Sequence, residues 1–168
     1  MTAEQLTAEQ LTAEQLRKDE LRTLDAEVEA VVFNSTWYRI RFDEKWQNGE
    51  AVECDRLRRP ADVALYRAWG WPAQAISPEE GLANFLAENA GEIQRGRIWE
   101  TPRYSTDIAA AWEMEEEIKR RGLYAEYGGA MSVLLDSPFV TASYYDFLHA
   151  SPELRCRAAL AAVREAAQ

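Results

Sequence analysis

The N-terminus carries three identical copies of the pentapeptide Thr-Ala-Glu-Gln-Leu, over residues 2–16. Each copy resembles a capping box, and Ala, Glu, Gln and Leu all favour helix. A five-residue period turns a helix by about 500°, so successive leucines are displaced by about 140° around its axis. The three leucines therefore cannot form one buried stripe or a coiled-coil seam. We predict a solvated helical extension over residues 1–19, rather than an oligomerisation arm, and a single folded domain over residues 20–168.

Composition restricts what that domain can do. The 168 residues are 47% hydrophobic, which is enough for a core, and carry a formal net charge of −10. An acidic chain without a basic tail is a poor ligand for nucleic acid or an anionic membrane, so we expect no direct DNA binding. One histidine and two cysteines cannot make a zinc cluster. No apolar run reaches the ~20 residues of a membrane span, and no leader is visible. We expect a cytoplasmic protein with no metal, no cofactor and no membrane association.

Apolar spacing predicts several helices. Leu21, Leu24, Val28 and Val31 form one face of a helix that ends at about Phe33, with Asp25, Glu27 and Glu29 away from its centre. Further helices are expected over residues 62–69, from Pro78 after the cap Ser77, over about 107–121, and from Pro152 after the cap Ser151. In the helix at 107–121 we expect Ser105 or Thr106 as the cap and a buried Trp112, whose replacement by Ala would cost about 3–5 kcal/mol.

Alternating patterns predict strands. Tyr38, Ile40 and Phe42 alternate with Arg39 and Arg41, so one face should be buried and the other should present guanidinium groups. A return strand is expected over residues 51–54 after the turn at 48–49. Residues 123–127 and 130–135 read as two strands joined through Gly128-Gly129, and 139–145 as a third. Helices with a small antiparallel sheet make an α+β fold, in which we expect an α/β/α sandwich.

Three stretches together resemble the phage ABA sandwich domain of phage and prophage proteins. They are Leu24-Asp25-Ala26-Glu27-Val28-Glu29, Pro102-Arg103-Tyr104-Ser105-Thr106-Asp107-Ile108-Ala109-Ala110-Ala111-Trp112 and Leu154-Arg155-Cys156-Arg157-Ala158-Ala159-Leu160. The resemblance covers roughly residues 20–35 and 100–168, and leaves a Trp-rich variable insert at about 36–99. It implies the sandwich fold and a phage or prophage setting in a bacterial cell. It implies no catalytic residues.

Residues that suggest enzyme chemistry have simpler interpretations. His149 is the one neutral-pH base, but it has no recognisable partner motif and reads as a surface residue. Cys156 lies on the apolar stripe of the last helix with Leu160 and Val163, as a buried inert thiol would. The acids between Glu113 and Glu117 point in different directions around a helix, as on a solvated face.

The insert carries the binding candidates, because five of the six tryptophans fall between residues 36 and 100 with several arginines among them. Trp and Arg dominate interface hot spots, and both stack on nucleotide ligands. The candidate ligand- or partner-binding residues are Trp37, Arg39, Arg41, Trp46, Arg56, Arg58, Arg59, Trp69 and Trp71. The competing interpretation is that the tryptophans fill a core and the arginines neutralise the chain's own acids.

The leading hypothesis is a small non-enzymatic phage or prophage accessory protein that binds a protein or a small anionic ligand, for example in counter-defence. Homo-oligomerisation stays open. The alternatives are an uncharacterised enzyme with carboxylate or Tyr chemistry, and a virion or assembly-associated structural protein.

Overall fold

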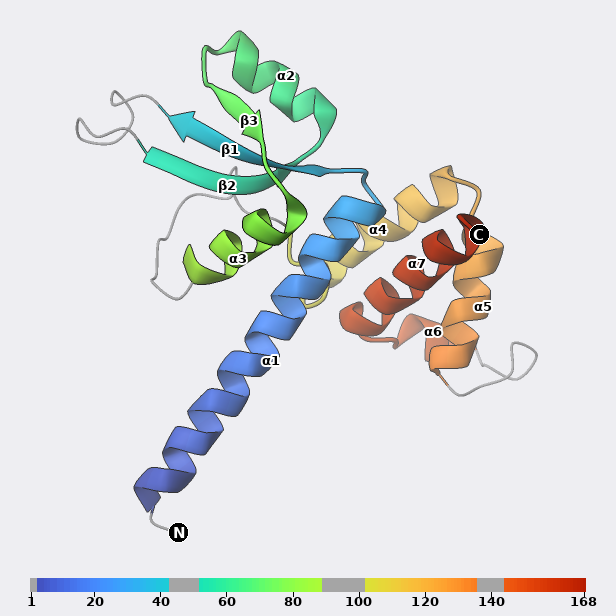
Figure 1. Ribbon diagram of the computed structural model, residues 1–168. Helices are drawn as coiled ribbons and strands as arrows, with labels where there is room; N and C mark the ends of the chain where they lie inside the picture. The colour runs from blue at the N-terminus through green and yellow to red at the C-terminus, as the bar shows by residue number, and fades with distance from the viewer. Residues whose placement is uncertain (1–2, 43–51, 89–101, 136–143) are drawn as a thin grey trace. The chain divides into compact units, whose positions relative to one another are not determined.

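A computed structural model describes residues 3–42, 52–88, 102–135 and 144–168 (Figure 1). The chain divides into two compact units, each described by itself. Residues 1–25 and 103–168 form the first, which we call the helical unit, and residues 26–102 form the second, the sheet unit. The elements are α1 (Ala3–Val31), β1 (Thr36–Phe42), β2 (Val52–Arg58), α2 (Pro60–Ala68), β3 (Ala73–Ala75), α3 (Pro78–Glu88), α4 (Ile108–Arg120), α5 (Tyr124–Leu134), α6 (Tyr144–Leu148) and α7 (Pro152–Ala166). The predicted α+β class is confirmed.

The pentapeptide repeats are helical, as predicted, and form the first half of the continuous helix α1. The helix ends where expected, because Asn34 takes the left-handed backbone conformation with φ of 55°. Two acids of α1 differ from the prediction, since Asp25 and Glu29 are each only 5% exposed. Each carboxylate is buried because it accepts hydrogen bonds, Asp25 from the backbone of Ser105 and Glu29 from the Ser35 hydroxyl.

The three strands form one antiparallel sheet in the order β2-β1-β3, with Tyr38 opposite both Arg56 and Ala75. The predicted hairpin between β1 and β2 is confirmed, while its turn lies outside the described residues. This sheet lies entirely within the predicted insert, so the Trp-rich stretch supplies the strands of the fold.

Helices cover both faces of the sheet, which gives the sheet unit a helix–sheet–helix arrangement (Figure 1). On one face Trp37 and Leu57 pack against Phe85 of α3. On the other face Ile40 packs against Tyr66 of α2 and against Trp71. The predicted alternation therefore holds for Ile40, but the opposite face also buries a large aromatic residue.

Gly81 allows α3 to lie close to the sheet. A Cβ atom at this position would fall 2.4 Å from Cδ2 of the Trp37 indole, well inside carbon–carbon contact distance. The indole is also in contact with Phe85, at 5.7 Å between ring centroids. Only a residue without a side chain fits there without displacing the tryptophan.

Helix starts follow the predicted caps at two of three places. The hydroxyls of Ser77 and Ser151 accept from the third amides of α3 and α7, at 3.2 Å each. At α4 the cap is Asp107, whose carboxylate accepts from the amide of Ala109 at 2.9 Å, in place of Ser105 or Thr106. Ser105 instead bonds to α1.

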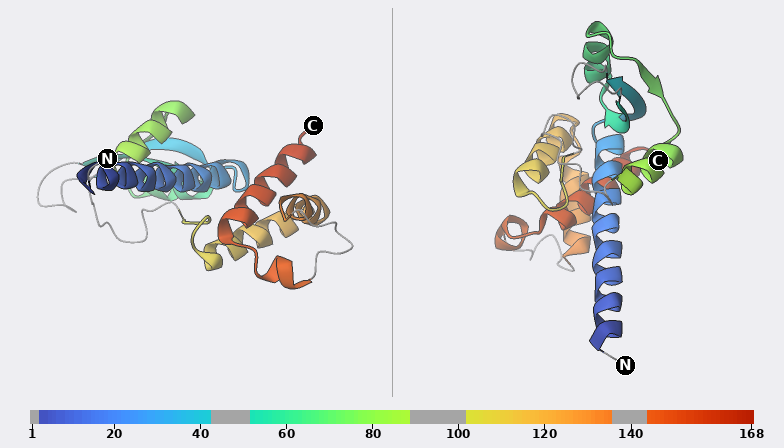
Figure 2. Two further views of the ribbon diagram at one scale, coloured as in Figure 1. Left: turned by 90° about the horizontal axis from the view of Figure 1, so that it is seen from below. Right: turned by 90° about the vertical axis from the view of Figure 1, so that its left-hand side faces the viewer.

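In the helical unit, α4 and α5 pack against α7 (Figures 1 and 2). The prediction of two strands over residues 123–135 is wrong, because this segment is the helix α5. Gly128 and Gly129 lie inside the helix, and Gly128 is buried. Ala, Glu, Met and Leu around them favour helix, and packing against α7 offsets the cost of two glycines. The third predicted strand is tested only at its end, where residues 144–145 begin α6, since 139–143 lie outside the described residues.

The predicted burial of Trp112 is also wrong, since 56% of this residue is exposed. The buried face of α4 consists of Ala111, Met114 and Ile118. Met114 takes the place expected for Trp112 on this buried face, so Ile108 and Trp112 lie outside it, 39% and 56% exposed.

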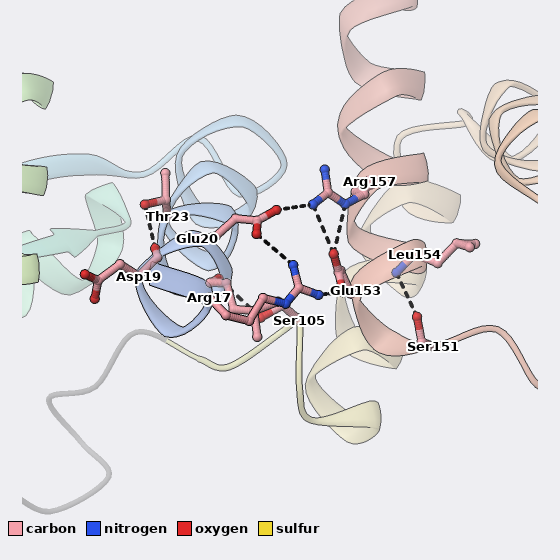
Figure 3. A network of polar contacts seen from close by, with 10 residues as sticks. Arg17, Asp19, Glu20, Thr23, Ser105, Ser151, Glu153, Leu154 and Arg157 are labelled. Atoms are coloured by element: carbon pink, nitrogen blue, oxygen red, sulfur yellow. Dashed lines mark hydrogen bonds and ion pairs between the residues drawn. The ribbon is translucent and has the colours of Figure 1, made fainter. Parts of the chain in front are cut away.

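Polar contacts tie α1 to the rest of the helical unit (Figure 3). Glu20 of α1 accepts from Arg157 of α7 at 2.8 Å, and Arg17 pairs with Glu153. The Ser105 amide donates to Asp25 at 2.6 Å. The ion pairs lie on the surface and contribute little each, whereas the contact between Ser105 and Asp25 is buried.

Candidate partner-binding surface

An exposed aromatic residue marks the end of α2. Leu65 and Trp69 are four residues apart and are 51% and 58% exposed. Between them Tyr66 turns inward to the core. Gly70, with φ of 81°, ends the helix and reverses the chain. We call Leu65 and Trp69 together the α2 knob.

The knob is held in position by buried rings. The Trp69 and Trp71 ring centroids are 5.2 Å apart in an edge-to-face arrangement, and Trp69 lies 6.1 Å from Tyr66. Trp71 is only 9% exposed. A tryptophan fixed in this way loses little side-chain freedom on binding, which favours its use as a contact residue.

Arg39, predicted to present a free guanidinium, is engaged by the chain's own acids. It donates through Nε and Nη2 to both carboxylate oxygens of Asp55 at 2.9 Å, and through Nη2 to Glu80 at 2.8 Å. The amide of Asn84 also donates to Asp55, at 2.7 Å. Burial opposes ionisation of Asp55, but these hydrogen bonds outweigh it and hold the pKa of Asp55 below its usual value.

Three more predicted arginines have structural partners. Arg56 donates to the carbonyl of Asp55, and Arg58 to the carbonyl of Leu57, each at 2.7 Å. Arg58 is only 6% exposed, and its Nε also donates to the Tyr66 hydroxyl at 2.9 Å. Arg59 donates to Glu29 at 3.1 Å and lies 4.0 Å over the ring of Phe33.

The predicted site residues therefore do not form one site, because some lie in the core and others on the surface. Trp37 and Trp71 belong to the core, as the competing interpretation held, and Trp46 lies outside the described residues. Trp69 and Arg41 are exposed. Within the part of the chain that the structure describes, Arg41 has no carboxylate partner. Leu65 was missed, although its spacing of four from Trp69 on a predicted helix is the signal that identifies it.

In the helical unit one buried polar cluster combines a carboxylate, a tyrosine and an arginine. Glu115 accepts from the Tyr127 hydroxyl and from Arg155. Arg155 also donates to the carbonyls of Ala150, Phe147 and Leu148, so it fastens the end of α6 to α7. Burial and the neighbouring Glu115 raise the pKa of Tyr127, which keeps the phenol protonated. The three side chains of this cluster are thus bonded to one another and to the backbone, which is a structural arrangement.

Of the remaining chemical candidates, Cys156 and His149 lie where predicted, whereas the prediction of a solvated face is wrong for Glu115 and Glu117, whose side chains are only 21% and 14% exposed. Cys156 is fully buried, and burial raises the pKa of its thiol, which disfavours the reactive thiolate. His149 is on the surface. Glu117 pairs with Arg120 and Arg121, which lowers the pKa of Glu117 to about 2.

The described residues hold neither a metal cluster nor a membrane span. No group of three or more His, Cys, Asp or Glu side chains there is placed to hold a metal ion. No described helix is both long and apolar enough to cross a membrane.

No family model, curated protein or solved structure matches this chain.

Proposed function

We propose that this chain is a non-enzymatic binding protein that contacts a protein partner through the α2 knob. The observation that carries the proposal is the exposed Trp69, in edge-to-face contact with the buried Trp71 and four residues from the exposed Leu65 on α2. Exposed, pre-positioned tryptophans are enriched among the few residues that supply most of the free energy of an interface. The setting we propose is that of a phage or prophage accessory protein in the bacterial cytoplasm, which follows from the family resemblance.

Binding of a small anionic ligand, the other possibility in the leading hypothesis, has less support than binding of a protein. It requires guanidinium groups that are free to bind phosphate or carboxylate in a bidentate manner. Arg39 already makes such a pair with Asp55, and Arg58 is buried. The exposed apolar side chains of the α2 knob fit a protein surface better than a phosphate.

The test compares two exposed tryptophans. Immobilised parent, Trp69→Ala and Trp112→Ala proteins are used to capture partners from a lysate of phage-infected bacteria, with quantification by mass spectrometry. Trp112 is a matched control, because it is 56% exposed but lies in the helical unit. The proposal expects a partner that the parent and Trp112→Ala retain and that Trp69→Ala binds about 30-fold more weakly, the equivalent of about 2 kcal/mol.

Folding of each variant is checked by circular dichroism before capture. A partner that Trp69→Ala retains at full affinity would show that the knob is not the contact surface. Loss of the partner in Trp112→Ala alone would place the contact in the helical unit.

A further inference from the structure

The two outer edges of the sheet differ. Backbone hydrogen-bonding directions alternate along an antiparallel strand, and two hydrogen bonds define them here. The Arg41 amide donates to the Pro72 carbonyl and the Ile76 amide to the Trp37 carbonyl, each at 3.1 Å. The odd-numbered residues of β1 therefore face β3, and its even-numbered residues face β2. It follows that Ala73 and Ala75 point their amides and carbonyls away from the sheet, as do Asp55 and Leu57 on the other edge.

The outer edge of β2 is protected. The outward carbonyl of Asp55 accepts from Arg56 Nη1, and the outward carbonyl of Leu57 accepts from Arg58 Nη1. Charged side chains that cover edge groups are a known device against pairing with another strand. Two of the arginines predicted to bind a ligand thus close one edge of the sheet.

The outer edge of β3 is open within the described residues. No side chain there donates to the carbonyls of Ala73 or Ala75. Gln74 and Ala75 are exposed. The strand starts directly after Trp71 and Pro72, so the open edge lies next to the rings that support Trp69.

We propose that an extended peptide segment of a partner adds to β3 as a fourth strand and packs an apolar side chain on Trp69. This inference rests on the proposed function, for which it supplies the mode of binding. Strand addition needs the free donors and acceptors that Ala73 and Ala75 offer, and side-chain pockets on alternate residues give it specificity. The side chains of Ala73 and Ala75 lie on the face covered by α2, together with the knob.

The sheet face opposite to α2 indicates which polar residues the peptide would carry. Gln74 pairs with Arg39 in the sheet register, and the exposed Arg41 lies on that same face. A peptide with apolar residues on one side and carboxylates on the other matches both faces. A second copy of this chain fits less well, because two copies with a net charge of −10 each repel, and two knob residues cannot supply the ~1,000 Å² of a stable interface.

The experiment selects binders from a displayed library of random peptides, using the immobilised full-length chain. Enriched peptides are synthesised with one backbone N-methyl group at each position in turn. Strand addition expects more than tenfold weaker binding when alternate amides are methylated and little change at the positions between them. Ala75→Pro, which removes an outward amide on an edge strand, should abolish binding, whereas Ala75→Val, which keeps the amide, should retain it.

The methylation series stands even if Ala75→Pro fails to fold. Failure to enrich a peptide, or binding that is insensitive to methylation, would overturn strand addition. If a peptide binds regardless of backbone methylation but loses binding in Trp69→Ala, strand addition is refuted while the proposed function stands. An alternating pattern that persists in Trp69→Ala would support strand addition and refute the knob. Light scattering that shows a dimer of the parent and a monomer of Ala75→Pro would identify a second copy as the occupant, against the proposal.

Discussion

Gly81→Ala tests the close approach of α3 to the sheet. In an open helix this change would stabilise the protein by about 1 kcal/mol, because Ala favours helix and Gly does not. Here the new methyl carbon would lie 2.4, 2.5 and 2.6 Å from three atoms of the Trp37 indole. Overpacking a tight core in this way costs up to about 3 kcal/mol. We therefore expect a net loss of about 2 kcal/mol in the free energy of unfolding.

Gly129→Ala is the matched control, since Gly129 also lies in a helix but has open space around it, with nothing within 4 Å of the place that a Cβ atom would take. It should stabilise by about 0.5–1 kcal/mol. Urea unfolding followed by tryptophan fluorescence and circular dichroism measures both changes. The two variants should thus shift in opposite directions. If Gly81→Ala stabilises as much as the control, the indole does not lie against α3 and the packing described for the sheet unit is wrong.

Three further outcomes are expected. Burial raises the pKa of Asp25 to about 6, above its ordinary 3.8, so the native state binds this proton more tightly and the free energy of unfolding should fall by about 3 kcal/mol as pH rises from about 4 to about 7. Asp25→Asn should remove that component from urea titrations across this range, and parallel parent and variant profiles would contradict it. Trp112→Ala should cost less than about 1 kcal/mol in thermal unfolding, since the residue is mostly exposed; a loss of about 3 kcal/mol or more would mean that it is buried in solution. Deleting residues 2–11 should leave stability within about 1 kcal/mol, as the unfavourable repeat period predicts, whereas a loss above about 2 kcal/mol would indicate buried repeat leucines.

Local features of the structure could be predicted from residue type. The caps Ser77 and Ser151 act as expected, because a hydroxyl next to the first helical amides satisfies them whatever surrounds it. The helix of α1 and its end shortly before Asn34 follow from helix propensity and from a residue that tolerates positive φ. The alternation around Ile40 identified β1. The burial of Cys156 was predicted correctly because its neighbours on the helix are apolar.

The failures share a cause, which is that the outcome depends on a distant segment. Gly128 and Gly129 look like a turn until α7 packs against the helix that contains them. Trp112 is exposed because the buried face of α4, which is set by its neighbours in the fold, runs through Ala111, Met114 and Ile118. The candidate site shows the same limit, since Trp69 was identified by composition. For Arg39 the sequence offered neutralisation by the chain's own acids only as the competing interpretation, and did not indicate that Asp55 and Glu80 together engage it.

Short stretches of sequence are thus sufficient to predict where most helices begin and end and which strand pattern starts the sheet. These depend on backbone propensity, capping and composition, which act over a few residues. The folded chain alone shows which arginines are occupied, which tryptophans are core, and which edge of the sheet is open. Those depend on strand order and on side chains brought together from positions such as 39, 55 and 80, because the fold decides which groups lie beside a charge or a strand edge.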